Sequence, residues 1–136
     1  MQIFLDANVI FSAAGFAGAV RRFVHLLLDA GHVLCADGYV IEEARRNLAA
    51  KRAGHEAEFH ALLKRLKIVP AGPQGAAVEA LTMLAEKDRP VLAAAIRAKC
   101  DALVTGDATH FGRLFGKSVH GVTIHSTRSL YRAVFG

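Results

Sequence analysis

Short apolar runs and longer amphipathic segments follow one another along the chain, a pattern typical of alternating strands and helices. The first apolar run, at residues 3–5, stops at the acidic Asp6 and predicts a buried strand of a parallel sheet. Similar runs predict four further strands, at residues 32–36, 67–69, 101–105 and 122–125.

Between these strands, apolar residues recur at helical spacing. Val20, Val24 and Leu27 mark the first such helix, which Gly31 closes. The same spacing predicts helices at residues 39–50, 55–66 and 88–100, one through residues 83–84, a helical turn at 111–115, and a last helix that ends at residue 135. The segment PAGPQG, residues 70–75, is a loop too short to link two domains.

Strands that alternate with helices favour a parallel sheet covered by helices on both faces. We therefore expect the α/β class, with a three-layer α/β/α sandwich around a roughly five-stranded parallel sheet. The length of 136 residues suits one domain of ordinary size, and the sequence contains no internal repeat. A single domain over residues 1–136 is expected.

The composition is that of a folded, basic protein. The hydrophobic fraction of 53% is enough for a core, and the charged fraction of 21% is not typical of a disordered chain. A formal net charge of +5 and a pI of about 9.6 favour a polyanionic partner such as nucleic acid, although many basic proteins bind none.

Cysteine use and the start of the chain favour a cytoplasmic location. Cys35 and Cys100 lie in apolar runs without CxxC spacing, as is typical of buried thiols in a reduced cytosolic protein. The first predicted strand begins almost at Met1, which leaves no room for a signal peptide. No apolar stretch approaches the ~20 residues that a membrane-spanning helix needs. We expect no membrane contact.

Acidic residues fall where a parallel sheet places its ligand site. Asp6 ends the first predicted strand and Asp107 follows the fourth, and ligands of such sheets bind at the carboxyl ends of the strands. Asp88 opens the helix that leads into the fourth strand, and Glu43 lies one turn into the helix after the second. These four acids are therefore expected to converge on one rim.

Converging carboxylates repel one another, so each would have a raised pKa unless a cation is present. Hard oxygen ligands of this kind suit Mg²⁺ or Mn²⁺, and no cysteine or histidine set has the spacing of a zinc site. Two ions ~3.5–4 Å apart can activate a water and stabilise the leaving oxygen of a phosphodiester, without a covalent nucleophile from the protein.

Each acid also has a structural interpretation. Asp88 and Asp107 each precede a helical segment and could serve only as N-caps. Glu43 could be a solvated helix acid paired with Arg46. Asp6 interrupts an apolar strand end, where a charge is costly unless something binds it. The coincidence of all four favours a shared site.

The motifs together resemble those of the PIN-domain family, the fold of VapC-type toxin ribonucleases and of domains like the PilT N-terminus. FLDANVIFSA resembles the family's opening Asp-x-Asn after the first strand, and YVIEEARRNL resembles the helix with its second acid, here Glu43. DRPVLAAAIRAKCDALVTGDATHF supplies matches to the third acid, Asp88, and to the acid of the Thr-x-Asp segment, Asp107. VTIHSTRSL resembles the last strand and helix.

This resemblance implies a hydrolase, a Mg²⁺- or Mn²⁺-dependent endoribonuclease that cleaves single-stranded RNA. Asp6, Glu43, Asp88 and Asp107 would be the catalytic metal ligands. The resemblance also implies a toxin with a cognate antitoxin that covers the acidic rim, and a homodimer.

Five further residues near the acids are interpreted individually. Asn8 matches the family's Asn and either orients Asp6 through a hydrogen bond or serves turn chemistry. Thr105 either binds a ligand or water, or only ends its strand. Asp101 occupies a place where family members often carry an acid, but at the amino end of its strand it is expected to point away from the cluster. His110 and Phe111 are interpreted as a surface histidine and a buried phenylalanine.

Substrate recognition is expected to depend on backbone charge and RNA shape, because the aromatic content is 7% with no Trp. Nine basic residues could guide a phosphate backbone toward the rim, although most such charges are solvated helix faces. They are Arg21, Arg22, Arg45, Arg46, Lys51, Arg52, Lys64, Arg65 and Lys67.

Other functions compete with the nuclease. A haloacid-dehalogenase-like phosphatase also uses an Asp after its first strand, but it needs a second Asp where this chain has Asn8. A non-catalytic RNA- or protein-binding module would use the acids only as caps. A nucleotide-binding site is disfavoured, because GFAGAV is no GxGxxG and no P-loop lysine follows.

Overall fold

Six strands form one sheet in the computed structural model, which describes residues 1–70 and 84–136. They are β1 (Gln2–Leu5), β2 (Val33–Ala36), β3 (Lys67–Ile68), β4 (Ala102–Val104), β5 (Ser118–Val119) and β6 (Val122–His125). The order across the sheet is β3-β2-β1-β4-β6-β5. The five predicted strands are all present and parallel, and β5 adds an antiparallel edge strand next to β6 that the sequence did not predict.

The central strand β1 pairs with β2 on one side and with β4 on the other. Phe4 is in register with Cys35 and with Leu103, and Leu5 is in register with Val104. Because β1 and β4 are parallel neighbours, their carboxyl ends meet at one edge of the sheet. The residues that follow each strand are thereby placed side by side.

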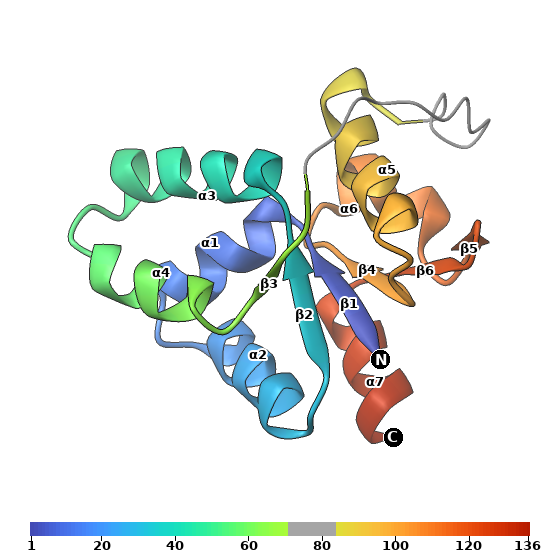
Figure 1. The fold of residues 1–136 in the computed structure, drawn as a ribbon, viewed down its shortest axis with the longest axis horizontal. Helices are drawn as coiled ribbons and strands as arrows, with labels where there is room; N and C mark the ends of the chain where they lie inside the picture. Colours follow the sequence, from blue (N-terminus) through green and yellow to red (C-terminus); the bar gives the residue numbers. More distant parts are fainter. Residues whose placement is uncertain (71–83) are drawn as a thin grey trace.

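Helices cover both faces of this sheet, so the predicted three-layer arrangement is confirmed. In Figure 1, α1–α4 lie on one side of the sheet and α5 and α6 on the other, while α7 contacts α2 and β6. The helices are α1 (Ala7–Gly15), α2 (Ala19–Asp29), α3 (Gly38–Lys51), α4 (Glu56–Leu63), α5 (Arg89–Arg97), α6 (Ala108–Phe111) and α7 (Thr127–Phe135), with the 3-10 turns η2 (Glu86–Asp88) and η3 (Gly112–Leu114).

Most of the predicted helices are present in the structure, and one observed helix was not predicted. The sequence pattern did not predict α1, which follows β1 immediately. Residues 71–83, which contain most of the predicted 70–75 loop and the helix through Met83, lie outside the described residues.

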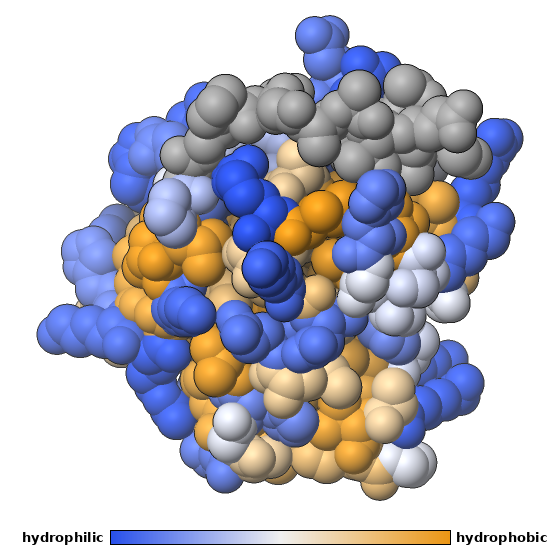
Figure 2. All heavy atoms as spheres, turned by 45° about the vertical axis from the view of Figure 1, so that its right-hand side comes forward, coloured by the Kyte–Doolittle hydropathy of each residue, from blue (hydrophilic) through white to orange (hydrophobic). Residues whose placement is uncertain are grey.

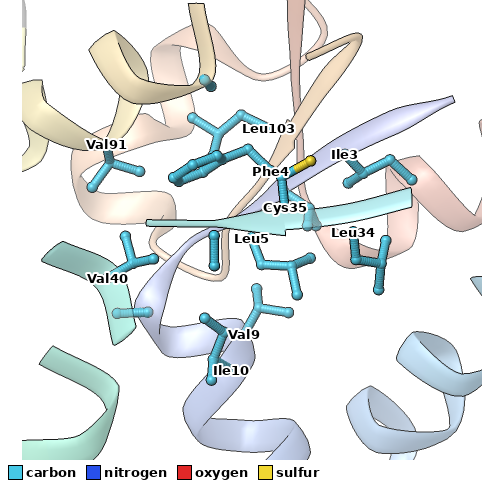
Figure 3. Close-up of a cluster of buried hydrophobic side chains, with 14 of the residues drawn as sticks. Ile3, Phe4, Leu5, Val9, Ile10, Leu34, Cys35, Val40, Val91 and Leu103 are labelled. Carbon is cyan, nitrogen blue, oxygen red and sulfur yellow. The ribbon is translucent and has the colours of Figure 1, made fainter. Parts of the chain in front are cut away.

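The core lies on both faces of the sheet. In Figure 3, Phe4 lies toward Leu103 and Val91, whereas Leu5 lies toward Val9 and Ile10 of α1. All six side chains are at most 2% exposed. This two-sided burial explains why β1 is an uninterrupted apolar run and not an alternating one.

Cys35 and Cys100 are buried free cysteines, as predicted. On the face seen in Figure 2, hydrophilic side chains lie among smaller apolar areas. Within residues 1–70 and 84–136, no single helix has the length and apolarity to cross a membrane, and α1 with α2, bent by 104°, meets those criteria only as a pair.

Candidate metal centre

Asp6 is the most buried of the four acids, Asp6, Glu43, Asp88 and Asp107, that were expected to form the acidic rim. It follows β1, caps α1 by accepting a hydrogen bond from Ala7 N at 2.7 Å, and is 4% exposed. Burial raises the pKa of Asp6 to about 6, although hydrogen bonds from Thr105 and Ala7 oppose that shift, and the charge of Glu43 adds to it. The carboxylate is thus held where its negative charge is costly without a cation.

A buried hydroxyl and an amide fix the orientation of Asp6. Thr105 Oγ1 donates to Asp6 Oδ2 at 2.8 Å and accepts from Asp107 N at 3.1 Å. Asn8 Nδ2 lies 3.4 Å from Asp6 Oδ2 and 3.3 Å from Thr105 Oγ1, while Asn8 Oδ1 accepts from Gly106 N at 2.8 Å. Asn8 and Thr105 therefore tie the ends of β1 and β4 together through the carboxylate between them.

Asp107 is clamped by a histidine on the first turn of α6. Its Oδ1 accepts from His110 N at 3.0 Å, and its Oδ2 lies 2.5 Å from His110 Nδ1. Burial acts to raise the pKa of Asp107, but the hydrogen bonds from His110 outweigh it, so the pKa is below its usual value. The N-cap role considered for Asp107 is present, and it leaves Oδ2 facing the histidine ring.

Asp88 is 8% exposed and, although it precedes α5, its side chain makes no capping hydrogen bond. Its Oδ2 is buried and has no hydrogen-bond donor, although His110 Nδ1 lies 3.4 Å away. Burial raises the pKa of Asp88, and the charges of His110 and Lys87 oppose this shift. A buried carboxylate oxygen without a donor is costly, and a cation would satisfy it.

Glu43 approaches the same rim from α3 and is half-buried. Its charge and that of Asp88 act on Asp6, and all three carboxylates contribute, after burial, to a raised pKa of the Tyr39 hydroxyl. Tyr39 donates to the carbonyl oxygen of Lys87 at 2.6 Å, which links the start of α3 to η2. That link holds the helix of Glu43 against the turn of Asp88.

Asp6 thus shares Thr105 with Asp107 and lies within the electrostatic influence of Glu43 and Asp88, while Asp88 and Asp107 lie within 4.8 Å of each other and Asp101 lies apart. Asp101 accepts a hydrogen bond from Gln2 N at 2.7 Å at the amino end of the sheet, as expected for a structural residue. The gathered oxygen donors suit a hard divalent cation.

His110 is the site residue that sequence reasoning missed, since it was interpreted as a surface histidine. Its ring nitrogen and one oxygen each of Asp88 and Asp107 lie within 4.8 Å of one another. The one local signal is its position three residues after Asp107, which places both on the same side of a helical turn. Tyr39 was also missed, because only the fold places it beside Asp88.

Several of the nine basic residues that could guide RNA make hydrogen bonds or ion pairs within the protein. Arg21 donates to the carbonyl oxygens of Ala13 and Ala14, and Arg52 donates to that of Gly15. Arg45 pairs with Glu42, and Arg65 with Asp29. An apolar hollow of about 350 Å³ between α2 and α7 contains none of the four acids.

A family model described as PIN domain matches residues 2–109. No curated protein matches the sequence.

Several solved structures share the fold. VapBC2 from Rickettsia felis, bound to a DNA fragment from their promoter, aligns with a TM-score of 0.68 at 15% identity over 93% of this chain and 98% of that chain. VapBC-1 from nontypeable Haemophilus influenzae aligns at 0.65 and 13% identity over 94% and 99%. Mycobacterium tuberculosis VapC20, described as a Sarcin-Ricin loop cleaving toxin, aligns at 0.59 and 18% identity over 86% and 98%.

Proposed function

This chain belongs to the PIN domain family, and from that premise we propose that it is a Mg²⁺- or Mn²⁺-dependent endoribonuclease that cleaves single-stranded RNA. The observation that carries the proposal is the convergence of four carboxylates, among which Asp88 Oδ2 is buried without a donor. Asp6, Glu43, Asp88 and Asp107 are the proposed metal ligands and catalytic residues.

The residues present fit a divalent cation. Buried Asp6 carries a raised pKa, and the donor set consists of hard oxygens, so a cation would relieve both the repulsion and the unsatisfied oxygen. When bound, Mg²⁺ or Mn²⁺ supplies Lewis acidity that activates water and offsets charge on a phosphodiester.

The protein's own side chains prepare this site. Thr105 and Asn8 hold the Asp6 carboxylate in one orientation, and His110 holds that of Asp107. The exposed Lys87 is close enough to Asp88 and Asp107 to favour their charged forms, and it can attract a phosphate to the rim.

Access to the rim favours a flexible strand. Asp6 and Asp88 are only 4% and 8% exposed, so a scissile phosphate must approach closely. A single strand can bend its backbone into such a rim, whereas a duplex holds its phosphates on a rigid surface. The VapC20 structure, named as a Sarcin-Ricin loop cleaving toxin, shares the fold and supports a nuclease by analogy.

We also propose that the protein is a toxin of a toxin–antitoxin pair. The similar VapBC2 and VapBC-1 structures are named as two-component assemblies. A cognate antitoxin would cover the acidic rim, and the toxin would form a homodimer. Co-expression with the neighbouring reading frame, followed by size-exclusion chromatography and activity assay, tests this: an inert complex supports the pairing, and an active mixture of separate proteins refutes it.

The deciding experiment follows cleavage of a labelled single-stranded RNA by the purified protein. It compares Mn²⁺ with EDTA, and Asp6→Asn with Asp29→Asn, which makes the same change at an exposed helix residue. We expect cleavage to require Mn²⁺, to disappear in Asp6→Asn and to persist in Asp29→Asn. Equal cleavage under all conditions would identify a contaminant. A folded, Mn²⁺-binding protein that cleaves no RNA of varied sequence would refute the function.

A further inference from the structure

His110 presents a ring nitrogen to the two acids nearest it. Asp107 caps α6 and His110 lies on its first turn, so the backbone hydrogen bond from His110 N to Asp107 Oδ1 orients both side chains to the same side. The ring Nδ1 is then 2.5 Å from Asp107 Oδ2 and 3.4 Å from Asp88 Oδ2. The imidazole, with its side chain 34% exposed, joins residues from two separate segments.

An independent observation shows that this arrangement is incomplete. Asp88 is more than nine-tenths buried, yet its Oδ2 receives no hydrogen bond despite its proximity to the ring. A ring nitrogen directs one N–H or one lone pair along one line, and here that line runs to Asp107. The Asp88 oxygen therefore points into the cluster without a partner.

We infer that His110 is a direct nitrogen ligand of the divalent ion, together with Asp88 and Asp107. This inference rests on the proposed function, because the ion is the one assigned there to the acidic rim. The three donor atoms lie within 4.8 Å of one another, and adjacent ligands of a small octahedral ion are about 3 Å apart, so only small side-chain movements are required.

A nitrogen ligand changes which ion the site prefers. Mg²⁺ is bound mainly by oxygen and releases its water reluctantly, whereas Mn²⁺ is a transition metal, at the weak end of their affinity order, and accepts an imidazole nitrogen more readily than Mg²⁺ does. The site should therefore prefer Mn²⁺ to Mg²⁺ by more than its carboxylates alone provide. If His110 only oriented Asp107, its loss would weaken the binding of Mn²⁺ and the binding of Mg²⁺ by the same factor.

The test is pulsed electron paramagnetic resonance of the full-length protein loaded with Mn²⁺, which detects ¹⁴N bound to the ion. The wild type is expected to show nitrogen coupling, His110→Gln to lose it, and His25→Gln, an exposed histidine on α2, to keep it. A bound Mn²⁺ without nitrogen coupling in the wild type overturns the inference, whether or not any variant folds. Coupling that survives in His110→Gln also overturns it.

Calorimetric titration supplies a second measurement. We expect His110→Gln to weaken Mn²⁺ binding about tenfold or more, and Mg²⁺ binding less. An unchanged ratio of the two affinities overturns the inference. RNA cleavage in the same samples separates the two proposals: Mn²⁺-dependent cleavage without nitrogen coupling leaves the nuclease intact, and nitrogen coupling without cleavage leaves the ligand assignment intact.

Discussion

The Thr105 hydroxyl donates a 2.8 Å hydrogen bond to Asp6 Oδ2 across 99 positions of sequence. Thr105 Oγ1 also accepts a hydrogen bond from Asp107 N, so one fully buried hydroxyl connects two of the converging acids. Both partners lie just beyond strand ends that are adjacent in the sheet, β1 and β4. The orientation of the carboxylates is therefore a consequence of strand order.

We expect Thr105→Val to damage both stability and site geometry. The substitution keeps the shape of the side chain but leaves Asp6 Oδ2 and Asp107 N without this partner, at a cost of about 1–3 kcal/mol of unfolding free energy. Thr105→Ser retains the hydroxyl and should cost less. Urea denaturation monitored by circular dichroism, with Mn²⁺ titration of each variant, measures both effects. Equal stability of the valine variant and the wild type would contradict the assigned network.

The strands β1, β2 and β4 were predictable because each is a short apolar run bounded by polar residues, and the expected convergence of the acids followed from the parallel order. The helix α1 was not, because ANVIFSAAG is apolar on nearly every side and has little helical periodicity. It packs against β1 and against α2–α4, which removes the need for a polar face. The edge strand β5 contains one apolar residue, Val119, and so forms no apolar run.

The site was predictable only as far as residue type revealed it. Four acids at strand and helix ends indicated a cation, but His110 differs from a surface histidine only through its distance to Asp88, which is 22 positions away and set by the fold. The same applies to Arg21 and Arg52, whose contacts with the end of α1 depend on a helix that was not predicted.

Mn²⁺ should raise the melting temperature of the protein, because an ion that binds only the native state stabilises it. At one hundred times the dissociation constant, the expected gain is about 2.7 kcal/mol. Asp107→Asn removes one ligand charge and should reduce the shift, while Asp29→Asn should leave it unchanged. Thermal unfolding followed by circular dichroism is the measurement. An identical shift in Asp107→Asn and Asp29→Asn would place the ion elsewhere.

Arg21 is expected to support structure and not RNA binding. Its guanidinium donates to Ala13 O at 2.7 Å and to Ala14 O at 2.9 Å, at the carboxyl end of α1 where helix carbonyls lack partners. Arg21→Ala should cost about 1.5–3 kcal/mol of unfolding free energy. Its exposed neighbour Arg22 is the matched control, and Arg22→Ala should cost little. If Arg21→Ala instead kept full stability and weakened the salt dependence of RNA binding, the residue would belong to the RNA interface.

Asp37 provides a pH dependence separate from the metal site. It caps α3 by accepting from Val40 N at 3.2 Å, and burial raises its pKa above the usual value, although that hydrogen bond and Arg97 oppose the shift. Because the native state holds the proton more tightly than the unfolded state, the stabilisation from Asp37 is complete below the unfolded pKa of about 3.9 and is lost as the pH rises through the native pKa.

Two substitutions at Asp37 therefore separate its charge from its capping oxygen. Asp37→Asn keeps an acceptor for Val40 N without the buried charge, so its stability relative to wild type should increase as the pH is raised from about 4 toward neutrality. Asp37→Ala removes both the charge and the capping oxygen, so it should be less stable than Asp37→Asn by about 1 kcal/mol at every pH. The unfolding free energies of the wild type and of both variants, measured from pH 4 to 7.5, separate the effect of the charge from that of the capping oxygen. Parallel pH profiles for Asp37→Asn and the wild type would show that burial of this carboxylate imposes no electrostatic cost.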